Sequence, residues 1–190
     1  MRNIKVKAFS KLPDQLAKVA EQFKKEAYQT GKPPYTEKQR AEHEEKFCSQ
    51  KDRFKYLLAF WGDEIVGGLT LLKREGVFHR KKILLGGIGG VWTRKDKQKK
   101  SVATTMLKKA MKVLIQNHCD IAYLRIETKI LRRLYERVGF LMLNRRHTFL
   151  GKSRKRYYAK DGMIALVTSK IIFNEILQDK KPFDIGKGNW

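Results

Sequence analysis

The feature that most constrains the fold is an apolar segment, residues 83–93, that leads directly into a lysine-rich turn and an amphipathic helix. The segment contains four glycines, and glycines inside a strand mark a bulge or a place where another backbone or a ligand comes close. Apolar residues recur at helical spacing from Ala103 to Leu114, and a second apolar run covers residues 121–126. This order predicts two strands joined by a crossover helix, with close approach at the glycines.

The turn between the first strand and the helix is a candidate anion-binding loop. Unpaired N–H groups at the start of a helix and the helix dipole both favour a negative charge there. Residues 98–103 read Gln-Lys-Lys-Ser-Val-Ala, and four lysines crowd the same turn: Lys95, Lys97, Lys99 and Lys100. The sequence therefore predicts a phosphate site at this turn.

Length and hydrophobic content favour a single domain. The chain has 190 residues, of which 42% are hydrophobic, so we expect one domain over residues 1–190 with a C-terminal tail at about 171–190. The first residues lack a secretory signal, and the longest apolar run, residues 83–92, is shorter than the roughly 20 residues of a membrane helix. These features indicate a cytoplasmic protein with no membrane partner, in which Cys48 and Cys119 are buried free thiols.

The chain is strongly basic, with 43 Lys and Arg against 19 Asp and Glu and a formal net charge of +24. Such a charge favours anionic partners, namely nucleic acid, phosphorylated cofactors or acidic proteins. Runs of charge are most often solvated surface. Residues 152–158 alternate basic and aromatic side chains, which makes this loop the best candidate for contact with nucleic acid.

The other periodic segments predict an α/β (α+β) protein with a mixed sheet flanked by helices. Alternating or continuous apolar runs indicate strands, helical spacing indicates helices, and glycine or proline marks the ends of several segments. The predicted segments are a strand at 4–9, helices at 16–27 and 36–53, a hairpin of 56–61 and 65–72, a loose basic loop at 73–82, a helix at 131–138, strand material from 140 and a last strand at 163–168.

The order of these elements and three motifs resemble the GCN5-related N-acetyltransferase (GNAT) superfamily. The motifs are Val91-Trp92-Thr93, the six residues 98–103, and Leu134-Tyr135-Glu136-Arg137-Val138-Gly139-Phe140, and the resemblance covers about residues 3–170. It implies a mostly antiparallel sheet of six to seven strands with a splayed central strand pair. It also implies acetyl-coenzyme A (acetyl-CoA) as co-substrate, with no metal. In this family the residues around 98–103 hold the pyrophosphate, and the preceding strand pairs with the pantetheine arm.

One position departs from the family pattern, because Ser101 stands where the motif usually has glycine. A serine there must sit at ordinary helical angles or crowd the ligand, although its hydroxyl could donate to a phosphate oxygen. The loop therefore either binds the cofactor or has lost that function and has only a structural role in the fold. Carried over from the family, the cofactor-binding residues are Val91, Trp92, Thr93, Gln98, Lys99, Lys100, Ser101, Val102, Ala103 and Thr104.

The resemblance also suggests catalytic residues. Tyr135 matches a tyrosine that often protonates the departing thiolate, although a core tyrosine is the alternative. Glu127 is a candidate general base at a strand end, with a surface ion pair to Arg125 or Lys129 as the alternative. The chain ends in Trp190, similar to the tails of some members that act on small molecules, including aminoglycosides. Its α-carboxylate is a second candidate base, unless the terminus is frayed.

The predicted function is direct transfer of an acetyl group from acetyl-CoA to an amine, with a backbone N–H near Val91 on the thioester carbonyl. The acceptor is either a small molecule or a protein amine, including an acidic or ribosome-associated protein. The alternative is a non-catalytic module of the same fold that binds nucleic acid or another polyanion. A homodimer is compatible with the family, and the four histidines, which show no metal-ligand spacing, are expected to be structural.

Overall fold

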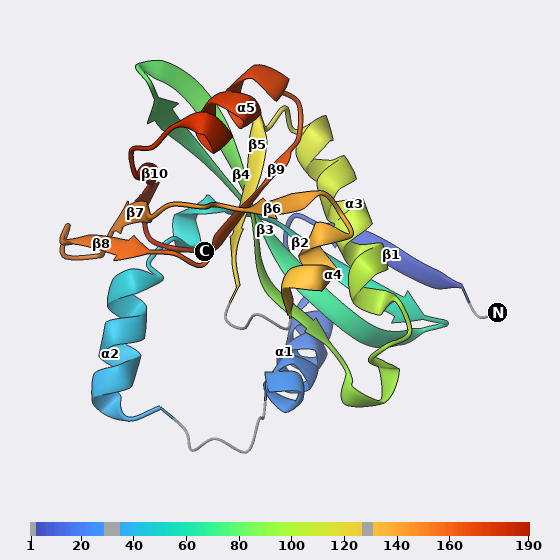
Figure 1. The fold of residues 1–190 in the computed structure, drawn as a ribbon. Helices are drawn as coiled ribbons and strands as arrows, with labels where there is room; N and C mark the ends of the chain where they lie inside the picture. The colour runs from blue at the N-terminus through green and yellow to red at the C-terminus, as the bar shows by residue number, and fades with distance from the viewer. Residues whose placement is uncertain (1–2, 29–34, 127–130) are drawn as a thin grey trace.

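The computed structural model describes residues 3–28, 35–126 and 131–190 as a mixed α/β fold (Figure 1). The helices are α1 (Asp14–Tyr28), α2 (Glu37–Lys46), α3 (Val102–Gln116), α4 (Arg132–Glu136) and α5 (Lys170–Gln178), with short 3-10 turns η1 (Gln50–Asp52) and η2 (Lys95–Lys97). The strands are β1 (Ile4–Phe9), β2 (Arg53–Trp61), β3 (Glu64–Phe78), β4 (Lys81–Thr93), β5 (Ile121–Arg125), β6 (Phe140–Met142), β7 (His147–Leu150), β8 (Arg156–Ala159), β9 (Gly162–Leu166) and β10 (Phe183–Lys187).

The main sheet has seven strands in the order β1-β2-β3-β4-β5-β9-β6. Its pairings are antiparallel except that of β4 with β5, which α3 joins as a crossover. This confirms the predicted fold class, including the crossover between the two central strands. A second sheet of three strands, β10-β7-β8, was not predicted.

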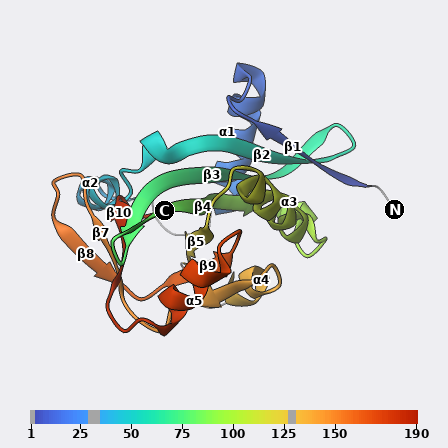
Figure 2. The ribbon, with the colours of Figure 1, turned by 90° about the horizontal axis from the view of Figure 1, so that it is seen from above.

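Both faces of the main sheet are covered. α1 and α3 lie on opposite sides of strands β1 to β4 (Figure 2). The α3 side holds the largest hydrophobic core, in which Met106, Leu107 and Leu114 are fully buried. The other side holds two smaller cores, one under α1 and one under α5 and β10. The central strands are apolar on both faces because each face packs against other elements.

Two predicted segments differ from the structure. The expected basic loop at 73–82 is instead the continuation of β3 into β4, paired as far as Phe78 with Lys81. Basic residues cluster at both ends of this segment and on its turn, which made it look like a loop, and His79 and Arg80 form the tight turn at positive φ. The expected helix at 36–53 ends at Lys46, and β2 already begins at Arg53.

The residues expected to form a C-terminal tail, 171–190, include most of α5 and all of β10. β10 runs parallel to β7, with Phe183 beside His147. Phe183, Ile185 and Ile176 are buried. Their burial anchors the last residues to the sheet, so Trp190 is not a frayed end.

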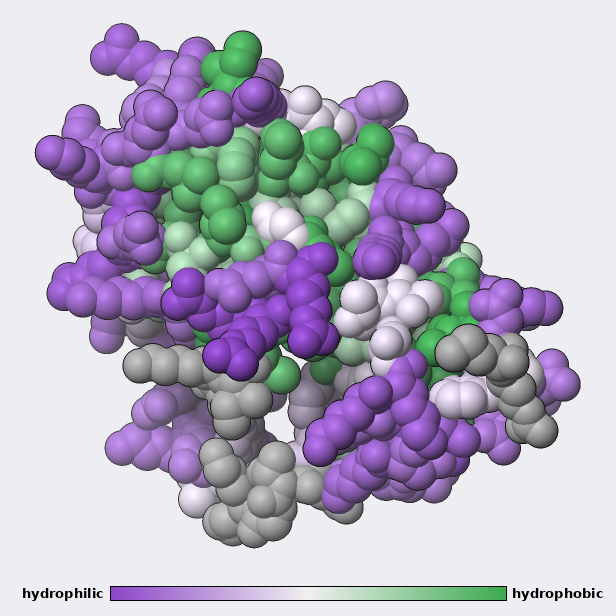
Figure 3. Space-filling model, turned by 45° about the vertical axis from the view of Figure 1, so that its right-hand side comes forward, coloured by the Kyte–Doolittle hydropathy of each residue, from purple (hydrophilic) through white to green (hydrophobic). Residues whose placement is uncertain are grey.

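On the side that carries α3, α4 and β6, apolar side chains gather in a patch surrounded by hydrophilic residues (Figure 3). Several large apolar side chains on these and neighbouring elements are exposed, among them Ile115, Leu131, Leu141 and Leu166. Within the described ranges, no helix is both long and apolar enough to cross a membrane.

Candidate active site

The two central strands separate partway along their length. β4 and β5 form only three parallel pairs, the last being Gly87 with Tyr123. β4 then continues to Thr93, whereas β5 ends at Arg125. The edge of β4 from Ile88 onward therefore lacks a β5 partner in the described chain, and the predicted splayed pair is present.

A β-bulge interrupts β4 within this unpaired stretch. Trp92 lies opposite Gly68 and Gly89 lies opposite Thr70, so Gly90 and Val91 face one residue of β3. Gly90 has φ +58°, a conformation that a glycine adopts without strain. A bulge releases backbone groups from the ladder, which leaves them available to a ligand. The Val91 carbonyl accepts a hydrogen bond of 2.9 Å from the Tyr28 hydroxyl at the end of α1.

The loop that follows β4 delivers the start of α3 to the mouth of the gap. Gln98, Lys99, Lys100 and Ser101 are exposed, and α3 begins at the next residue. The first N–H groups of a helix have no acceptor within it, so they remain available to an anion. The loop therefore combines backbone donors with positive charge at one place.

Ser101 adopts the left-handed conformation, with φ +60° and ψ +11°. The expectation that a serine here must take ordinary helical angles or crowd a ligand is therefore wrong in its first part, because Ser101 holds the conformation usually taken by glycine. For an L-residue this conformation costs about 1–2 kcal/mol. The Ser101 carbonyl accepts both the N–H and the hydroxyl of Thr105, at 2.9 Å each, which helps to hold the turn.

Aromatic and acidic neighbours fix part of the basic loop. Lys97 and Lys100 lie over the Trp61 ring, with their Nζ atoms 4.9 and 5.5 Å from its centroid. Asp96 pairs with Arg94 at 3.0 Å and with Lys97 at 3.5 Å. The hydrogen bond from Arg94 is the largest cause that lowers the pKa of Asp96. The loop is thus a braced surface rather than a set of independent lysines.

The side chains predicted to line the pantetheine point in different directions. The Trp92 indole packs on Gly68 and belongs to the core under α1, so only its backbone can face the gap. Val91 and Thr93 are half-buried. Val102 is buried in the core on the α3 side, while Ala103 and Thr104 are half-buried in the first turn of α3.

Tyr135 lies on α4 and is buried on the α3 side of the sheet. Its ring meets the Phe140 ring edge to face, with centroids 6.2 Å apart. Both the predicted acid role and the core alternative are compatible with this position. Glu127 lies outside the described residues; its neighbour Arg125 forms an ion pair with Asp161.

Trp190 lies against β4 at the point where the strands separate. A Cβ on Gly87 would collide with the indole, so a side chain, rather than the backbone or ligand expected from the sequence, requires glycine here. The Arg74 guanidinium lies 4.6 Å from the centre of the indole. The Trp190 indole Nε1 donates a hydrogen bond to Asp52 Oδ2 at 3.3 Å. The terminus therefore closes one end of the gap.

A buried polar network connects β5 with the C-terminal segment. The Tyr123 hydroxyl donates to Asn189 Oδ1 at 2.9 Å and lies 2.8 Å from His147 Nε2. Because the phenol proton is used on Asn189, neutral His147 donates from Nε2. Burial is the main cause that lowers the pKa of His147 to about 4, although Asp161 opposes the shift. Burial also raises the pKa of Tyr123.

A groove of about 490 Å³ lies above this network, between α2 and the hairpin of β7 and β8. Its polar residues include Glu42 and Asp161, and Asp161 Oδ1 is buried without a hydrogen-bond partner among the described residues. The lining is rich in rings from distant segments: Tyr35, His43, Phe47, Phe149, Tyr157 and Tyr158.

The loop at 152–158, the candidate nucleic-acid contact, is the turn and second strand of this hairpin. Glu45 of α2 accepts hydrogen bonds from the Ser153 backbone N–H at 3.1 Å, from its hydroxyl at 2.6 Å and from the Tyr157 hydroxyl at 3.3 Å. The Tyr157 ring stacks on Phe149 at 5.5 Å. Part of the aromatic pattern thus attaches the hairpin to α2 and lines the groove.

The sequence did not identify Tyr123, His147, Asn189 or Asp161 as a set. Tyr123 lies in an apolar run, and the other three are far from it in the chain, so no spacing signals their contact. Cys119 is buried as expected, and burial raises its pKa to about 11, which makes it unreactive. Cys48 is only half-buried. The described part of the chain contains no cluster of three His, Cys, Asp or Glu side chains suited to a metal ion.

Comparison with known proteins identifies the relatives of this fold. A family model described as an acetyltransferase (GNAT) domain matches residues 9–142. Curated protein sequences give no match. Among solved structures, Escherichia coli ElaA superposes with a TM-score of 0.59 at 16% identity, covering 86% of this chain and 99% of that one.

Two further structures show the same fold. The ribosomal-protein-S18-alanine N-acetyltransferase of Escherichia coli has a TM-score of 0.53 at 13% identity, with 86% of this chain and 94% of that chain covered. A probable N-acyltransferase from Enterococcus faecalis has a TM-score of 0.52 at 16% identity, with 71% of this chain covered. This chain spans about a third of the Enterococcus protein, 32% of its length.

Proposed function

Because the chain belongs to the GNAT acetyltransferase family, we propose that it transfers an acetyl group from acetyl-CoA to an amine by direct attack. When bound, acetyl-CoA supplies a thioester whose carbonyl carbon accepts the amine. The observation that carries the proposal is the conformation of Ser101, which preserves the glycine-type turn at the start of α3. Residues held in such conformations are enriched at ligand sites, so this backbone favours a binding loop over a loop that keeps only the fold.

The donor side of the proposed site is the gap between β4 and β5. The N–H groups of the first turn of α3 and the surrounding lysines would hold the pyrophosphate. The unpaired edge of β4, from Val91 to Thr93, would pair with the pantetheine arm. A backbone N–H released by the bulge near Val91 would stabilise the oxyanion that forms on the thioester oxygen.

Tyr135 remains our proposed acid for the departing thiolate, and Trp190 and Glu127 remain candidate bases. Trp190 lies at the closed end of the gap, against Gly87. Its proposed contribution is the α-carboxylate, and an appended glycine tests that contribution because it moves the carboxylate while keeping the indole. An unchanged pH profile of kcat in that variant would remove Trp190 from the proposal.

The groove between α2 and the β7–β8 hairpin is the proposed site of the acceptor. It lies beside Arg125 at the end of β5, where the central strands have separated. Its charged residues are of both signs, although the whole chain carries a charge of +24. An acceptor ammonium would meet less repulsion here than at the basic loop.

A calorimetric titration with acetyl-CoA tests the proposal most directly. We expect binding that weakens about tenfold, or about 1.4 kcal/mol, when Lys99 and Lys100 are replaced by glutamate. The matched control replaces Lys108 and Lys109, which lie further along α3, by glutamate with the same change in charge. No heat from the wild-type chain, together with salt-dependent binding of nucleic acid, would instead support a non-catalytic module.

Thiol release with a panel of acceptors then identifies the amine. The panel includes a peptide with N-terminal alanine, because one structural relative is named for that acceptor, together with a lysine peptide, a simple polyamine and an aminoglycoside. Since like charges repel, we expect polycationic acceptors to react more slowly than a peptide with one free amine. Equal rates for all acceptors would contradict this order.

A further inference from the structure

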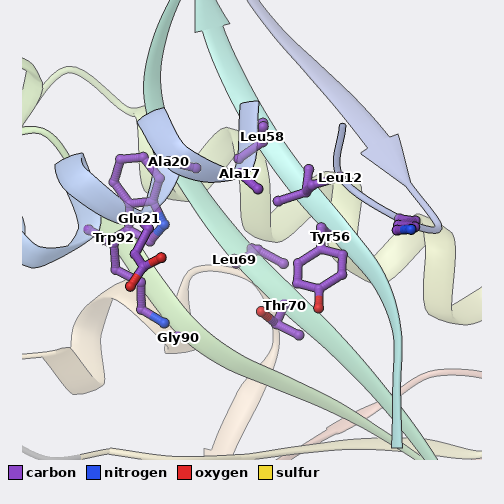
Figure 4. A pocket seen from close by; sticks show the side chains of 12 residues that line it. Leu12, Ala17, Ala20, Glu21, Tyr56, Leu58, Leu69, Thr70, Gly90 and Trp92 are labelled. Atoms are coloured by element: carbon purple, nitrogen blue, oxygen red, sulfur yellow. The ribbon is translucent and has the colours of Figure 1, made fainter. Parts of the chain in front are cut away.

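A cavity of about 310 Å³ lies under α1, on the side of β4 away from α3. Figure 4 shows Glu21, Trp92 and Gly90 at one side of this cavity and Tyr56 at the other. Apolar side chains form most of its lining, among them Leu12, Ala20, Leu58 and Leu69. The cavity therefore borders the bulge of β4 on the face opposite the pyrophosphate loop.

Lys24 extends from α1 to the bulge. Its Nζ lies 3.3 Å from the position that a Cβ on Gly90 would occupy. One turn later, the Tyr28 hydroxyl bonds to the Val91 carbonyl, so this end of α1 is docked at the bulge. Among the residues that the structure describes, Lys11 and Lys24 are the two lysines that line the cavity.

The surroundings of Lys24 lower the pKa of its ammonium group. Desolvation by neighbouring groups is the largest cause that lowers its pKa, repulsion from Arg53 adds to the shift, and Glu21 opposes it. Glu21 instead pairs with Lys25, at 3.1 Å. Within the described chain, no carboxylate lies at ion-pairing distance from Lys24 Nζ.

From this juxtaposition we infer that Lys24 is a site of self-acetylation, in which its amine takes the acetyl group when no other acceptor is bound. The inference rests on the proposed function, because the acetyl donor must lie in the gap beside the bulge. Lys24 approaches the bulge from the α1 face of the sheet. A nucleophile attacks a carbonyl carbon from one face of the carbonyl plane, so this approach suits attack on a thioester bound at the bulge.

Acetyl transfer to Lys24 exchanges a carbon–sulfur bond for a carbon–nitrogen bond. The Lys24 ammonium first releases a proton to water, and the nitrogen lone pair then forms a bond to the carbonyl carbon. The attacking nitrogen loses its second proton as the carbon–sulfur bond breaks, and the departing thiolate takes up a proton, so coenzyme A leaves as a thiol. The product is a neutral acetyl-lysine, and the acetyl methyl group gains an apolar cavity beside it.

The test incubates the full chain with acetyl-CoA and no acceptor, and follows intact mass and peptide mass. We expect one acetyl group on Lys24, added at a rate independent of protein concentration because the reaction is intramolecular. Lys25 on the same helix is the matched control, because both lysines are exposed but Lys25 pairs with Glu21 and does not line the cavity. We expect acetylation at Lys24 to be at least about tenfold faster than at Lys25.

Lys24→Arg keeps the positive charge but removes the nucleophile, so the added mass is expected to disappear, whereas Lys25→Arg keeps it. Similar acetylation of many surface lysines would overturn the inference, because it would indicate uncatalysed chemistry. Acetyl-CoA binding with turnover of an external acceptor, but an unmodified Lys24, would overturn the inference and leave the proposed function intact. Absence of acetyl-CoA binding would overturn both.

Discussion

The donor side and the acceptor side of the candidate site are built in different ways. The donor side uses one continuous stretch, from the bulge at Gly90 to the first turn of α3. The acceptor groove uses α2, the end of β5, the β7–β8 hairpin and Asn189. A continuous stretch can carry a motif, because the spacing along the chain determines the geometry. A groove of separate segments depends on the whole fold for its shape.

The two sides should therefore respond differently to substitution. Changes on the donor side act on groups held by local backbone geometry, and they should alter acetyl-CoA binding or chemistry. Changes on the acceptor side act on packing between segments, and they should alter acceptor affinity or stability.

The largest effect is expected from Tyr135→Phe. Removal of the hydroxyl leaves the ring packed on Phe140 but takes away the proposed acid, so kcat should fall by about 10²-fold or more. Steady-state kinetics with a saturating acceptor measures this change. The matched control is Tyr157→Phe on the acceptor side, which loses a bond to Glu45 and should keep its kcat within about threefold. A full kcat for Tyr135→Phe would sink the acid assignment.

Acid should weaken the acceptor side through His147. Because the folded state lowers the pKa of His147 to about 4, the unfolded chain, whose histidine titrates near 6.5, binds more protons between these values. Stability contributed by this neutral histidine is therefore complete above about pH 6.5 and is lost as the pH falls toward 4, by about 3 kcal/mol. Denaturant unfolding across this range measures it.

The variant His147→Gln should flatten that pH dependence, and His118→Asn, at an exposed position, should leave it unchanged. His147→Gln is also expected to lower the stability at neutral pH, since it disturbs the bond to Tyr123. If the wild-type curve is flat between pH 4 and 6.5, the proposed neutral state of His147 is wrong.

A smaller effect is expected at the left-handed serine. Ser101→Val places a β-branched residue at φ +60°, which should either unwind the turn or strain it, and acetyl-CoA affinity should fall about tenfold. Ser101→Gly suits the same conformation, so its affinity should equal or exceed that of the wild type. Calorimetry compares the three proteins. Equal affinity for valine and glycine would show that the turn does not control the donor site.

The smallest effect is expected at the rim of the groove. Tyr158→Ala removes an exposed ring from the groove lining, so the KM for the acceptor should rise about threefold to fivefold while the affinity for acetyl-CoA stays the same. Ile171→Ala, an exposed change on α5 outside the groove, is the control. A change in acetyl-CoA affinity without a change in KM would reverse the roles of the two sides.

The strands and helix of the donor side could be predicted from the sequence for a physical reason. The glycines of β4, the basic loop and the periodicity of α3 are local signals, and they predicted the crossover, whereas the splayed pair was implied by the family resemblance. Ser101 shows the limit of such signals, because its residue type alone did not reveal the left-handed backbone that its neighbours enforce.

The acceptor side was largely missed for the opposite reason. Tyr123 meets His147 and Asn189 only after β10 pairs with β7, a contact across more than thirty positions of the chain. The same parallel pairing turns the expected tail into a strand. No local periodicity encodes a contact of this kind, and the clustered basic residues around the β3–β4 turn hid the continuation of the long hairpin.

The braced basic loop has a consequence for the end of the proposed reaction cycle. A loop that recognises phosphates treats the acetylated donor and the spent thiol alike, since the two molecules differ only at their far end. Free coenzyme A should therefore compete with the donor for the enzyme, and its departure should slow as ionic strength falls. The lysines that speed capture would then also set the pace of product release, which makes turnover sensitive to the cell's ratio of free to acetylated carrier.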